Sequence, residues 1–297
     1  MIIIQMSGGL GNQMFQYALY LKLKKMGRLV KFDDVTTYKL DNARPIQLAV
    51  FGITYPRASE EEIRDITDSH MDMGSRIKRR FTGRQSLEYV EKDGCFDPEI
   101  LDVRDAYLVG NFQSEKYFAD IRDDVMSAFR FDPMLFSDAT KDMKRRIAEE
   151  SEEPVCIHVR RGDYLKADRV YGGICTEDYY RTAMKYMQEH HPGCVFYLFT
   201  DDVHWADFFV EEHSDMKVVP VTCSEAYTGY QDMYLISRCR HHIIANSTFS
   251  WWGWWLRKIR DGEVIAPAKW LNNGKCADIL TDDMIRIDGR GEILGRI

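Results

Sequence analysis

Short runs of β-branched and other apolar residues alternate with longer amphipathic stretches over most of the chain. Short apolar runs are typical of buried parallel strands, whereas a 3.6-residue period predicts a helix. The predicted strands are residues 2–5, 28–32, 107–110, 155–160, 194–200, 216–221, 242–246 and 264–267. The predicted helices are residues 12–26, 114–129, 137–150, 176–191, 203–213, 232–240 and 249–260. This alternation predicts an α/β fold with parallel, doubly wound sheets.

One break in the alternation suggests a domain boundary. The helix predicted at 137–150 runs into Glu149-Glu150-Ser151-Glu152-Glu153-Pro154, and the strand–helix pattern restarts directly afterwards. An acidic run that ends in proline is typical of a connection between domains. The 297 residues are enough for two domains of ordinary size. We therefore predict two Rossmann-like domains, residues 1–150 and 151–297, which face a cleft. Residues 55–100 fit the pattern least, and we expect charged surface helices and loops there.

Composition narrows the range of partners and compartments. The net charge of −7 argues against a nucleic-acid partner, although it leaves room for a local basic pocket. Seven cysteines, an odd number without a C-x-x-C pair, suggest reduced and mostly buried thiols. The chain has no apolar run of about 18 residues, the length that a membrane span needs. These features predict a cytoplasmic protein with at most peripheral membrane contact.

The sharpest chemical motif follows the strand predicted at 155–160. It reads His158-Val159-Arg160-Arg161-Gly162-Asp163. In open α/β sheets, ligands bind beyond the carboxyl ends of the strands. Two guanidinium groups beside a glycine suit a phosphate, because each can form paired hydrogen bonds and the glycine lets the backbone approach. The alternative is an arginine–aspartate ion pair that merely closes a turn.

Two further strand ends carry polar side chains. Asp201 and Asp202 follow one strand, and either could bind a metal, act as a general base, accept hydrogen bonds from a nucleobase or cap the next helix. Ser247, Thr248 and Ser250 follow another strand at a helix start, where free N–H groups attract anions. Plain capping would need only one of these hydroxyls. The four tryptophans after Ser250 fit either a core or a stacking surface for a sugar or base.

The N-terminal loop is a weaker signal. Gly8, Gly9 and Gly11 form neither a dinucleotide fingerprint nor a Walker loop, but Asn12 and Gln13 at its exit are placed to reach into a cleft. The adjacent histidine pairs lack the i, i+4 spacing of helical metal ligands, and no paired-cysteine pattern occurs. We expect neither a metal nor a cofactor.

Together these motifs resemble glycosyltransferase family 11, the α-1,2-fucosyltransferases. The size of the chain is similar to that of the bacterial members, which act in carbohydrate biosynthesis. The segments that carry the resemblance occur in the family's order and are residues 8–18, 110–118, 158–164, 199–202, 247–252 and 266–270. The resemblance covers nearly the whole chain and is weakest over residues 40–100.

This resemblance implies a GT-B type fold, GDP-fucose as donor, inversion at the fucose carbon, and no metal. The acceptor would be the 2-hydroxyl of a galactose-terminated oligosaccharide or of a glycolipid-linked glycan. In the second domain, the resemblance implies that Arg160 and Arg161 bind the pyrophosphate and that His158 lies beside the nucleotide. It implies that Ser247, Thr248 and Ser250 contact phosphate and that Asp201 and Asp202 face guanine. In the first domain, it implies that Asn12 and Gln13 lie on the acceptor or sugar side.

The sequence leaves three questions open. Asp163 and His158 are the nearest titratable groups for a general base, but water or the departing phosphate could also take the proton. One of Asp201 and Asp202 is expected to cap a helix rather than to bind guanine. Two other functions also fit: a core-type or protein O-fucosyltransferase, and a non-catalytic glycan or sugar-nucleotide binding protein.

Overall fold

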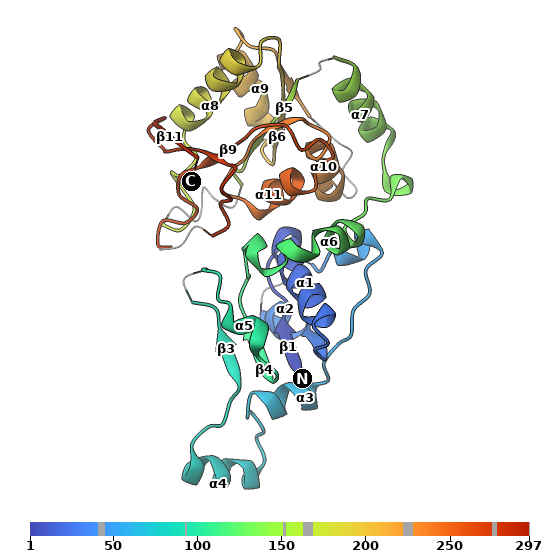
Figure 1. The fold of residues 1–297 in the computed structure, drawn as a ribbon, viewed down its shortest axis with the longest axis vertical. Helices are drawn as coiled ribbons and strands as arrows, with labels where there is room; N and C mark the ends of the chain where they lie inside the picture. The colour runs from blue at the N-terminus through green and yellow to red at the C-terminus, as the bar shows by residue number, and fades with distance from the viewer. Residues whose placement is uncertain are drawn as a thin grey trace. The chain divides into compact units, whose positions relative to one another are not determined.

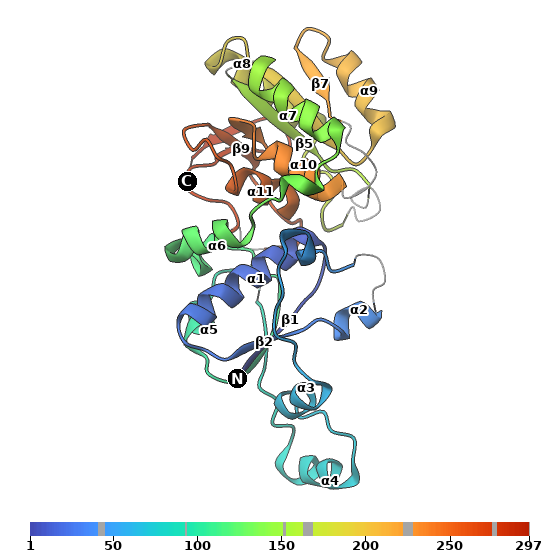
Figure 2. The ribbon, with the colours of Figure 1, turned by 90° about the vertical axis from the view of Figure 1, so that its right-hand side faces the viewer.

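The computed structural model describes residues 1–40, 45–92, 94–150, 153–162, 169–221, 228–274 and 278–296. The chain forms two compact units, Met1–Arg130 and Phe131–Ile297. Each unit has a sheet of mainly parallel strands with helices packed on it (Figures 1 and 2). The predicted fold class, two Rossmann-like α/β units, is confirmed.

The first unit contains a four-stranded sheet in the order β2-β1-β4-β3, with every neighbouring pair parallel. Its strands are β1 (Ile2–Gln5), β2 (Val30–Asp33), β3 (Glu88–Val90) and β4 (Ala106–Val109). Its α-helices are α1 (Leu10–Lys25), α2 (Thr36–Leu40), α3 (Glu60–Ile66), α4 (Met73–Thr82), α5 (Glu99–Asp102) and α6 (Arg122–Ala128). Its 3-10 turns are η1 (Leu48–Phe51), η2 (Glu115–Tyr117) and η3 (Ala119–Ile121).

The second unit contains a seven-stranded sheet in the order β11-β10-β9-β8-β5-β6-β7, in which only β11 is antiparallel to its neighbour. Its strands are β5 (Pro154–Val159), β6 (Val195–Thr200), β7 (Val218–Pro220), β8 (His241–Ile243), β9 (Val264–Pro267), β10 (Ile285–Ile287) and β11 (Ile293–Gly295). Its helices are η4 (Pro133–Leu135), α7 (Asp138–Glu150), α8 (Glu177–His190), α9 (Val203–Glu212), α10 (Thr228–Ile236) and α11 (Thr248–Trp255).

The boundary between the units lies 20 residues before the predicted one, at Arg130/Phe131 instead of Glu150/Ser151. Helix α7 belongs to the second unit because its N-terminal turn is bonded to α10. The Ser137 N–H and the Thr140 hydroxyl both donate to the Gln231 side-chain oxygen, at 2.7 and 2.6 Å. Phe136 also packs on Tyr234, with ring centroids 4.2 Å apart. The acidic run therefore joins two elements of one unit.

Three predicted helices differ from the observed ones. The helix predicted at 249–260 is α11, which already ends at Trp255. Residues 114–129 form two 3-10 turns and the short helix α6, because Phe118, with φ −141° and ψ 10°, leaves the helical region and interrupts the helix. Helix α10 ends at Ile236, four residues before the predicted end. There the Ser237 hydroxyl donates to the Tyr234 carbonyl at 2.6 Å and closes the last turn.

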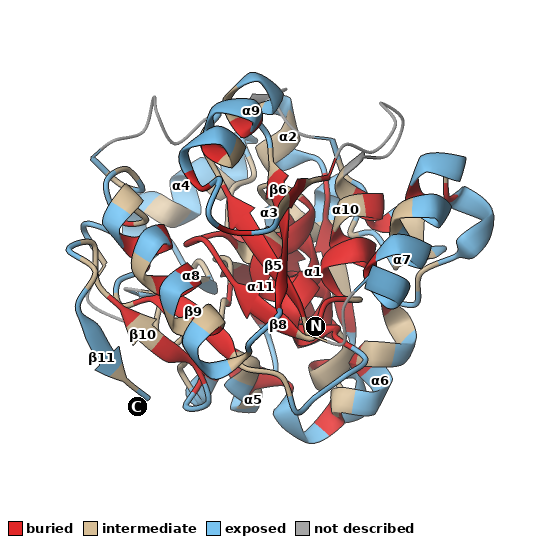
Figure 3. Cartoon of the chain, turned by 90° about the horizontal axis from the view of Figure 1, so that it is seen from above, coloured by how far each residue is buried: buried red, intermediate tan, exposed pale blue. Residues whose placement is uncertain are grey.

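The core of the second unit explains its long apolar runs. All six residues of β5 are buried, as expected for a central strand covered on both faces (Figure 3). Trp251, Trp252, Trp254 and Trp255 are at most 2% exposed. The tryptophans therefore form core, and the alternative of a sugar-stacking surface is wrong. Close packing also requires Gly253, since a Cβ there would lie 2.4 Å from Cγ2 of Ile236.

Among the described residues, no helix combines the length and the apolar character needed to cross a bilayer.

Candidate functional site

The carboxyl edge of the second sheet contains a topological switch point. The chain runs from β5 outward to β6 and β7, and then returns to β8 on the other side of β5. The connections that leave β5 and β8 therefore diverge, which is where open α/β sheets bind ligands. Three predicted site segments begin here, after β5, β6 and β8 respectively. They are residues 160–162, 201–202 and 246–250.

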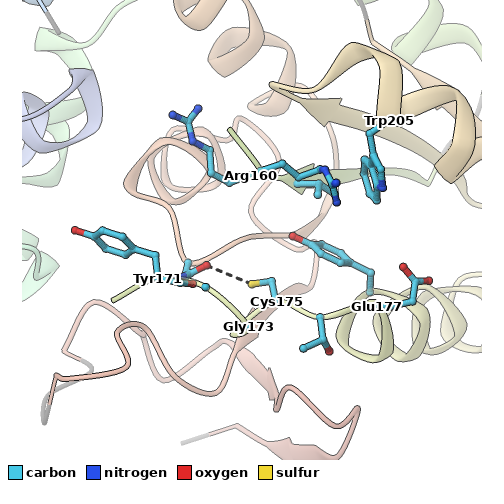
Figure 4. Close-up of a pocket in the computed structure, with 12 residues that line it drawn as sticks. Arg160, Tyr171, Gly173, Cys175, Glu177 and Trp205 are labelled. Carbon is cyan, nitrogen blue, oxygen red and sulfur yellow. Dashed lines mark hydrogen bonds between the residues drawn. The ribbon is translucent and has the colours of Figure 1, made fainter. Parts of the chain in front are cut away.

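A pocket of about 240 Å³ opens at this edge (Figure 4). Its wall combines the end of β5, the loop before α8, the first turns of α8, and single residues from α9 and the loop after β8. The lining residues include Arg160, Arg161, Tyr171, Cys175, Glu177, Tyr180, Trp205 and Asn246. Cationic and aromatic groups thus share one cavity, as a nucleotide site requires.

Asp201 organises the loop after β5. Its Oδ1 accepts the Arg161 backbone N–H at 2.9 Å, and its Oδ2 accepts the Gly162 N–H at 3.2 Å. The same Oδ2 lies 3.0 Å from Nη1 of Arg160. One carboxylate therefore fixes the backbone of this loop and orients its first guanidinium group.

Asp202 has a different role. Its Oδ1 accepts the Trp205 N–H at 3.1 Å and caps α9, while its Oδ2 lies 3.1 Å from Nε of Arg161. The bond from the Trp205 N–H, followed by the Arg161 guanidinium, lowers the pKa of Asp202. Arg161 also lies over the Trp205 ring at 4.5 Å, a cation–π contact. The expectation that one of the two aspartates caps a helix is confirmed, and Asp202 is that residue.

His158 lies beneath the loop and is only 4% exposed. Burial, followed by the nearby Arg160 charge, lowers its pKa to about 3. A group with so low a pKa takes up protons poorly at neutral pH, so His158 is suited to a neutral hydrogen-bonding role rather than to general base catalysis. Its buried Nδ1 makes no hydrogen bond to any residue that the structure describes.

The loop after β8 is rigid and close to the pocket. The Asn246 amide donates to the carbonyls of Tyr171 and Trp270, both at 3.2 Å, which ties the pocket loop to the strand end. Ser247 occupies the N-cap position of α11 without a side-chain capping bond, and Thr248 begins the helix. The Ser250 hydroxyl is buried and lies 3.2 Å from the Ser247 carbonyl. In this structure Ser250 therefore bonds to the helix backbone and does not present a group to the pocket.

The first unit has its own switch point, between β1 and β4. Asn12 lies in the first turn of α1, half-buried, and its Oδ1 accepts a 3.0 Å hydrogen bond from the Gln113 amide. Gln13 is fully buried: its amide nitrogen donates to the Gly8 carbonyl at 2.9 Å, and its oxygen accepts the Gln47 N–H at 2.8 Å. The prediction that Gln13 faces the acceptor is therefore corrected, because its polar atoms hold the glycine loop.

Two residues of this edge were missed by the sequence reasoning. Glu91 accepts the backbone N–H groups of Asn111 and Phe112 at 2.8 and 3.1 Å, and burial raises its pKa. Phe112 is fully buried with a φ of 52°, a left-handed backbone that is costly for a bulky residue. Together they fix the loop that aims Gln113 at Asn12. In the sequence, only the motif at 110–118 pointed to this loop. Glu91 lies about 20 residues before the loop in the chain, so no local pattern connects the two.

Asp163, predicted as a possible base, lies outside the described residues.

The sequence spacing did not reveal two groups of side chains that could hold a metal ion. They are Glu153 with His191 and His241, and Glu177 with Glu212 and His213. Each group is assembled from separate elements, so no sequence pattern marks it. In the first group, His241 Nδ1 accepts the Glu263 N–H at 3.0 Å, so its Nε2 carries the proton and points at Glu153. That histidine is therefore not disposed to bind a cation.

Comparisons with known proteins agree on one family. A family model described as glycosyl transferase family 11 matches residues 97–288. The chain is 30% identical to the O-antigen biosynthesis glycosyltransferase WbnK of Escherichia coli, covering 95% of this chain and 99% of that protein. It is also 30% identical to an α-1,2-colitosyltransferase of Escherichia coli, covering 91% and 92%. It is 26% identical to human galactoside α-(1,2)-fucosyltransferase 1, covering 84% and 64%.

Proposed function

Because the chain belongs to glycosyltransferase family 11, we propose that it transfers L-fucose from GDP-fucose to the 2-hydroxyl of a terminal galactoside. Transfer would invert the fucose anomeric carbon and would need no metal. The observation that carries this proposal is the Asp201-bonded arginine loop beside a pocket at the switch point. The human relative named for galactoside α-1,2-fucosylation supports the choice of sugar and linkage.

In this mechanism, the second unit stabilises the leaving nucleotide. Breaking the bond between fucose and phosphate leaves negative charge on GDP. Arg160 and Arg161 line the pocket in which that charge would develop, and the N-terminus of α11 follows Asn246 at the pocket wall. Helix N–H groups that are already in position lower the barrier without reorganisation, whereas Arg160 would first exchange its bond to Asp201 for one to the pyrophosphate.

Guanine recognition would follow from an exchange on Asp201. A carboxylate has about four acceptor positions, and Asp201 uses two for backbone N–H groups and one for Arg160. One position on Oδ1 is already free, and when Arg160 moves to the pyrophosphate, one position on Oδ2 becomes free as well. Those two positions match the N1–H and N2–H donors of guanine, which point the same way. We assign guanine recognition to Asp201 on this basis.

Gly162→Ala tests this loop. A Cβ at residue 162 would lie 2.7 Å from Oδ2 of Asp201, closer than a Cβ carbon approaches an oxygen in folded proteins. The Asp201 carboxylate or the loop must then shift, which weakens the bonds between them, so we expect GDP to bind about tenfold more weakly. Calorimetric titration with GDP measures this. Gly229→Ala is the matched control, because its Cβ would have an ordinary 3.6 Å contact with Phe249. Equal GDP affinity in the two variants would refute the role of the loop.

On the acceptor side, we propose that Asn12 and Gln113 bind sugar hydroxyls. Their amides already face one another at 3.0 Å, so a hydroxyl that bonds both is positioned precisely, and much of the barrier to transfer is positional.

Asp163 follows the arginine loop in sequence and remains our proposal for the general base. If it is the base, Asp163→Asn removes transfer but preserves GDP affinity.

The deciding experiment is a turnover screen. Purified protein is incubated with GDP-fucose and a panel of galactosides, and products are identified by mass and by NMR of the new linkage. We expect an α-1,2-linked fucosyl product and slow hydrolysis of GDP-fucose without acceptor. A binding protein would give neither. Since one relative is named a colitosyltransferase, GDP-colitose is tested in parallel, and faster transfer of colitose would replace fucose in the proposal.

Chelation should leave this activity intact. The arginines and the helix N-terminus supply the positive charge that a metal ion supplies in other transferases. Turnover of GDP-fucose with and without EDTA is therefore expected to agree within about twofold. Loss of activity in EDTA that manganese or magnesium restores would contradict this proposal. Glu177, Glu212 and His213 would then be the first ligands to replace, because Glu177 lines the pocket.

We also propose a cytoplasmic location. Among the described cysteines, Cys156, Cys175, Cys194 and Cys239 are free thiols, which suits a reducing compartment.

A further inference from the structure

Helix α4 in the first unit presents its apolar side to solvent. Met73, Ile77 and Phe81 are spaced four residues apart and therefore form one stripe along the helix. They are 78%, 53% and 83% exposed, and Met71 just before the helix is 82% exposed. None of the ten residues of α4 is buried. In Figures 1 and 2 the helix lies beyond α3, away from the strands of its unit.

The polar side of α4 faces the protein instead. Ser75 and Arg79 are the half-buried positions of the helix, and at about 100° per residue they lie opposite the apolar stripe. Nη2 of Arg79 donates to the His70 carbonyl, and its Nη1 donates to the Asp68 carbonyl at 3.1 Å. Asp72 caps the helix by accepting the Ser75 N–H at 2.9 Å. These polar contacts hold the stripe outward, which is the reverse of an ordinary surface helix.

Basic residues flank the stripe. Arg76 and Arg80 lie along one side of it and Lys78 along the other, and all three are exposed. None of the three forms an ion pair with a residue in the described ranges. The protein as a whole carries a net charge of −7, so this basic cluster is a local exception. We call Met71, Met73, Ile77 and Phe81, with Arg76, Lys78 and Arg80, the α4 face.

We propose that the α4 face binds the surface of an anionic lipid bilayer. The apolar stripe would enter the boundary between headgroups and acyl chains, while the basic side chains contact lipid phosphates, as in other interfacial helices. Ten residues span about 15 Å, so the helix lies in the interface and does not cross the membrane.

Charge complementarity selects this partner over two others. A nucleic acid would engage the basic residues but leave the apolar stripe in water. A second copy of the chain would cover the stripe but bring two sets of unpaired cations together, which is unfavourable. Of these three partners, an anionic bilayer is the one that satisfies both parts of the face. Surface attachment would also bring the protein to acceptors carried on lipids, a consequence that rests on the proposed function.

Vesicle sedimentation tests the proposal with the full-length protein. We expect it to sediment with vesicles of phosphatidylcholine and phosphatidylglycerol in equal parts, and not with phosphatidylcholine alone. Binding should fall as ionic strength rises, because the lipid charge is screened. Each basic residue at an anionic surface contributes about fivefold in partitioning. The Arg76→Glu/Arg80→Glu double variant should therefore bind at least about tenfold more weakly.

The apolar stripe has its own variant and control. Ile77→Ser combined with Phe81→Ser should reduce vesicle binding at least about tenfold, since both apolar side chains lose their burial in lipid. Met134→Ser removes an equally exposed methionine, 88% exposed in η4, and should bind like the unchanged protein. All variants should melt near the unchanged protein, because the replaced side chains are on the surface.

Three results would overturn the proposal. The first is no binding of the unchanged protein to the anionic vesicles. The second is equal binding by the Ile77/Phe81 double variant that has kept its melting temperature. The third is a concentration-dependent dimer, seen by sedimentation velocity without lipid and lost in the same variant, which would assign the α4 face to self-association. Because none of these measurements uses GDP-fucose, failure here would leave the proposed activity untouched.

Discussion

Replacing Arg160 with alanine should lower the turnover of GDP-fucose at least ~10²-fold, the loss expected when one charge-stabilising group is removed. Arg160 is held 3.0 Å from Asp201 at the mouth of the pocket. Its planar guanidinium can form two parallel hydrogen bonds to the departing phosphate, which a lysine ammonium cannot. Arg160→Lys should therefore restore little of the lost activity.

The measurement is the initial rate of fucosyl transfer with GDP-fucose and acceptor both near saturation, so that kcat is compared rather than binding alone. Arg145→Ala serves as the control, because this arginine is exposed on α7 and, among the described residues, its ion pair is with a neighbouring aspartate in the same helix. A folded Arg160→Lys variant with turnover close to that of the unchanged protein would refute the assigned role.

The second large effect concerns the choice of nucleotide. Asp201→Asn should reduce the preference for GDP over ADP by about tenfold or more, because the amide has one acceptor oxygen where the carboxylate has two. Adenine gains nothing from the carboxylate, since its N1 is an acceptor and it lacks the amino group at C2. Asp202→Asn should keep the GDP-to-ADP ratio and mainly lower thermal stability, because Asp202 caps α9.

Titrating both nucleotides against both variants decides between these roles. If Asp201→Asn weakens GDP and ADP equally, Asp201 only holds the loop and Arg160 in place. A change of ratio in Asp202→Asn alone would reverse the assignment. Thermal melting of each variant separates a lost contact with the nucleotide from a lost helix cap.

The fold was predictable where local pattern and packing agree. The apolar run at 155–160 became β5 within one residue, because a strand buried on both faces must be apolar throughout. The domain boundary was not predictable in the same way. Composition reveals a polar connection, but only the bonds of Gln231 show that α7 packs on the second unit. The prediction of one helix over 114–129 was wrong at Phe118, where the backbone leaves the helical region.

The candidate site was predictable at strand ends and not beyond them. Arg160, Asp201 and Asn246 follow parallel strands, so topology brings them together. Burial is not visible in the sequence, and Gln13 therefore looked like a ligand contact although it is a structural amide. Glu91 was missed because it is 20 residues away in sequence from Asn111, whose backbone N–H it accepts in the folded chain.

The ion pair between Arg160 and Asp201 also bears on which small anions can occupy the empty pocket. Before any donor arrives, the guanidinium already has a counter-charge, so the pair is close to neutral. Inorganic phosphate, sulfate or pyrophosphate must pull Arg160 away and leave a carboxylate without its cation, which costs free energy. Under the proposed function, a guanine nucleotide would offer that carboxylate two N–H donors in return. Phosphate, sulfate and pyrophosphate are therefore expected to compete only weakly with GDP for the pocket.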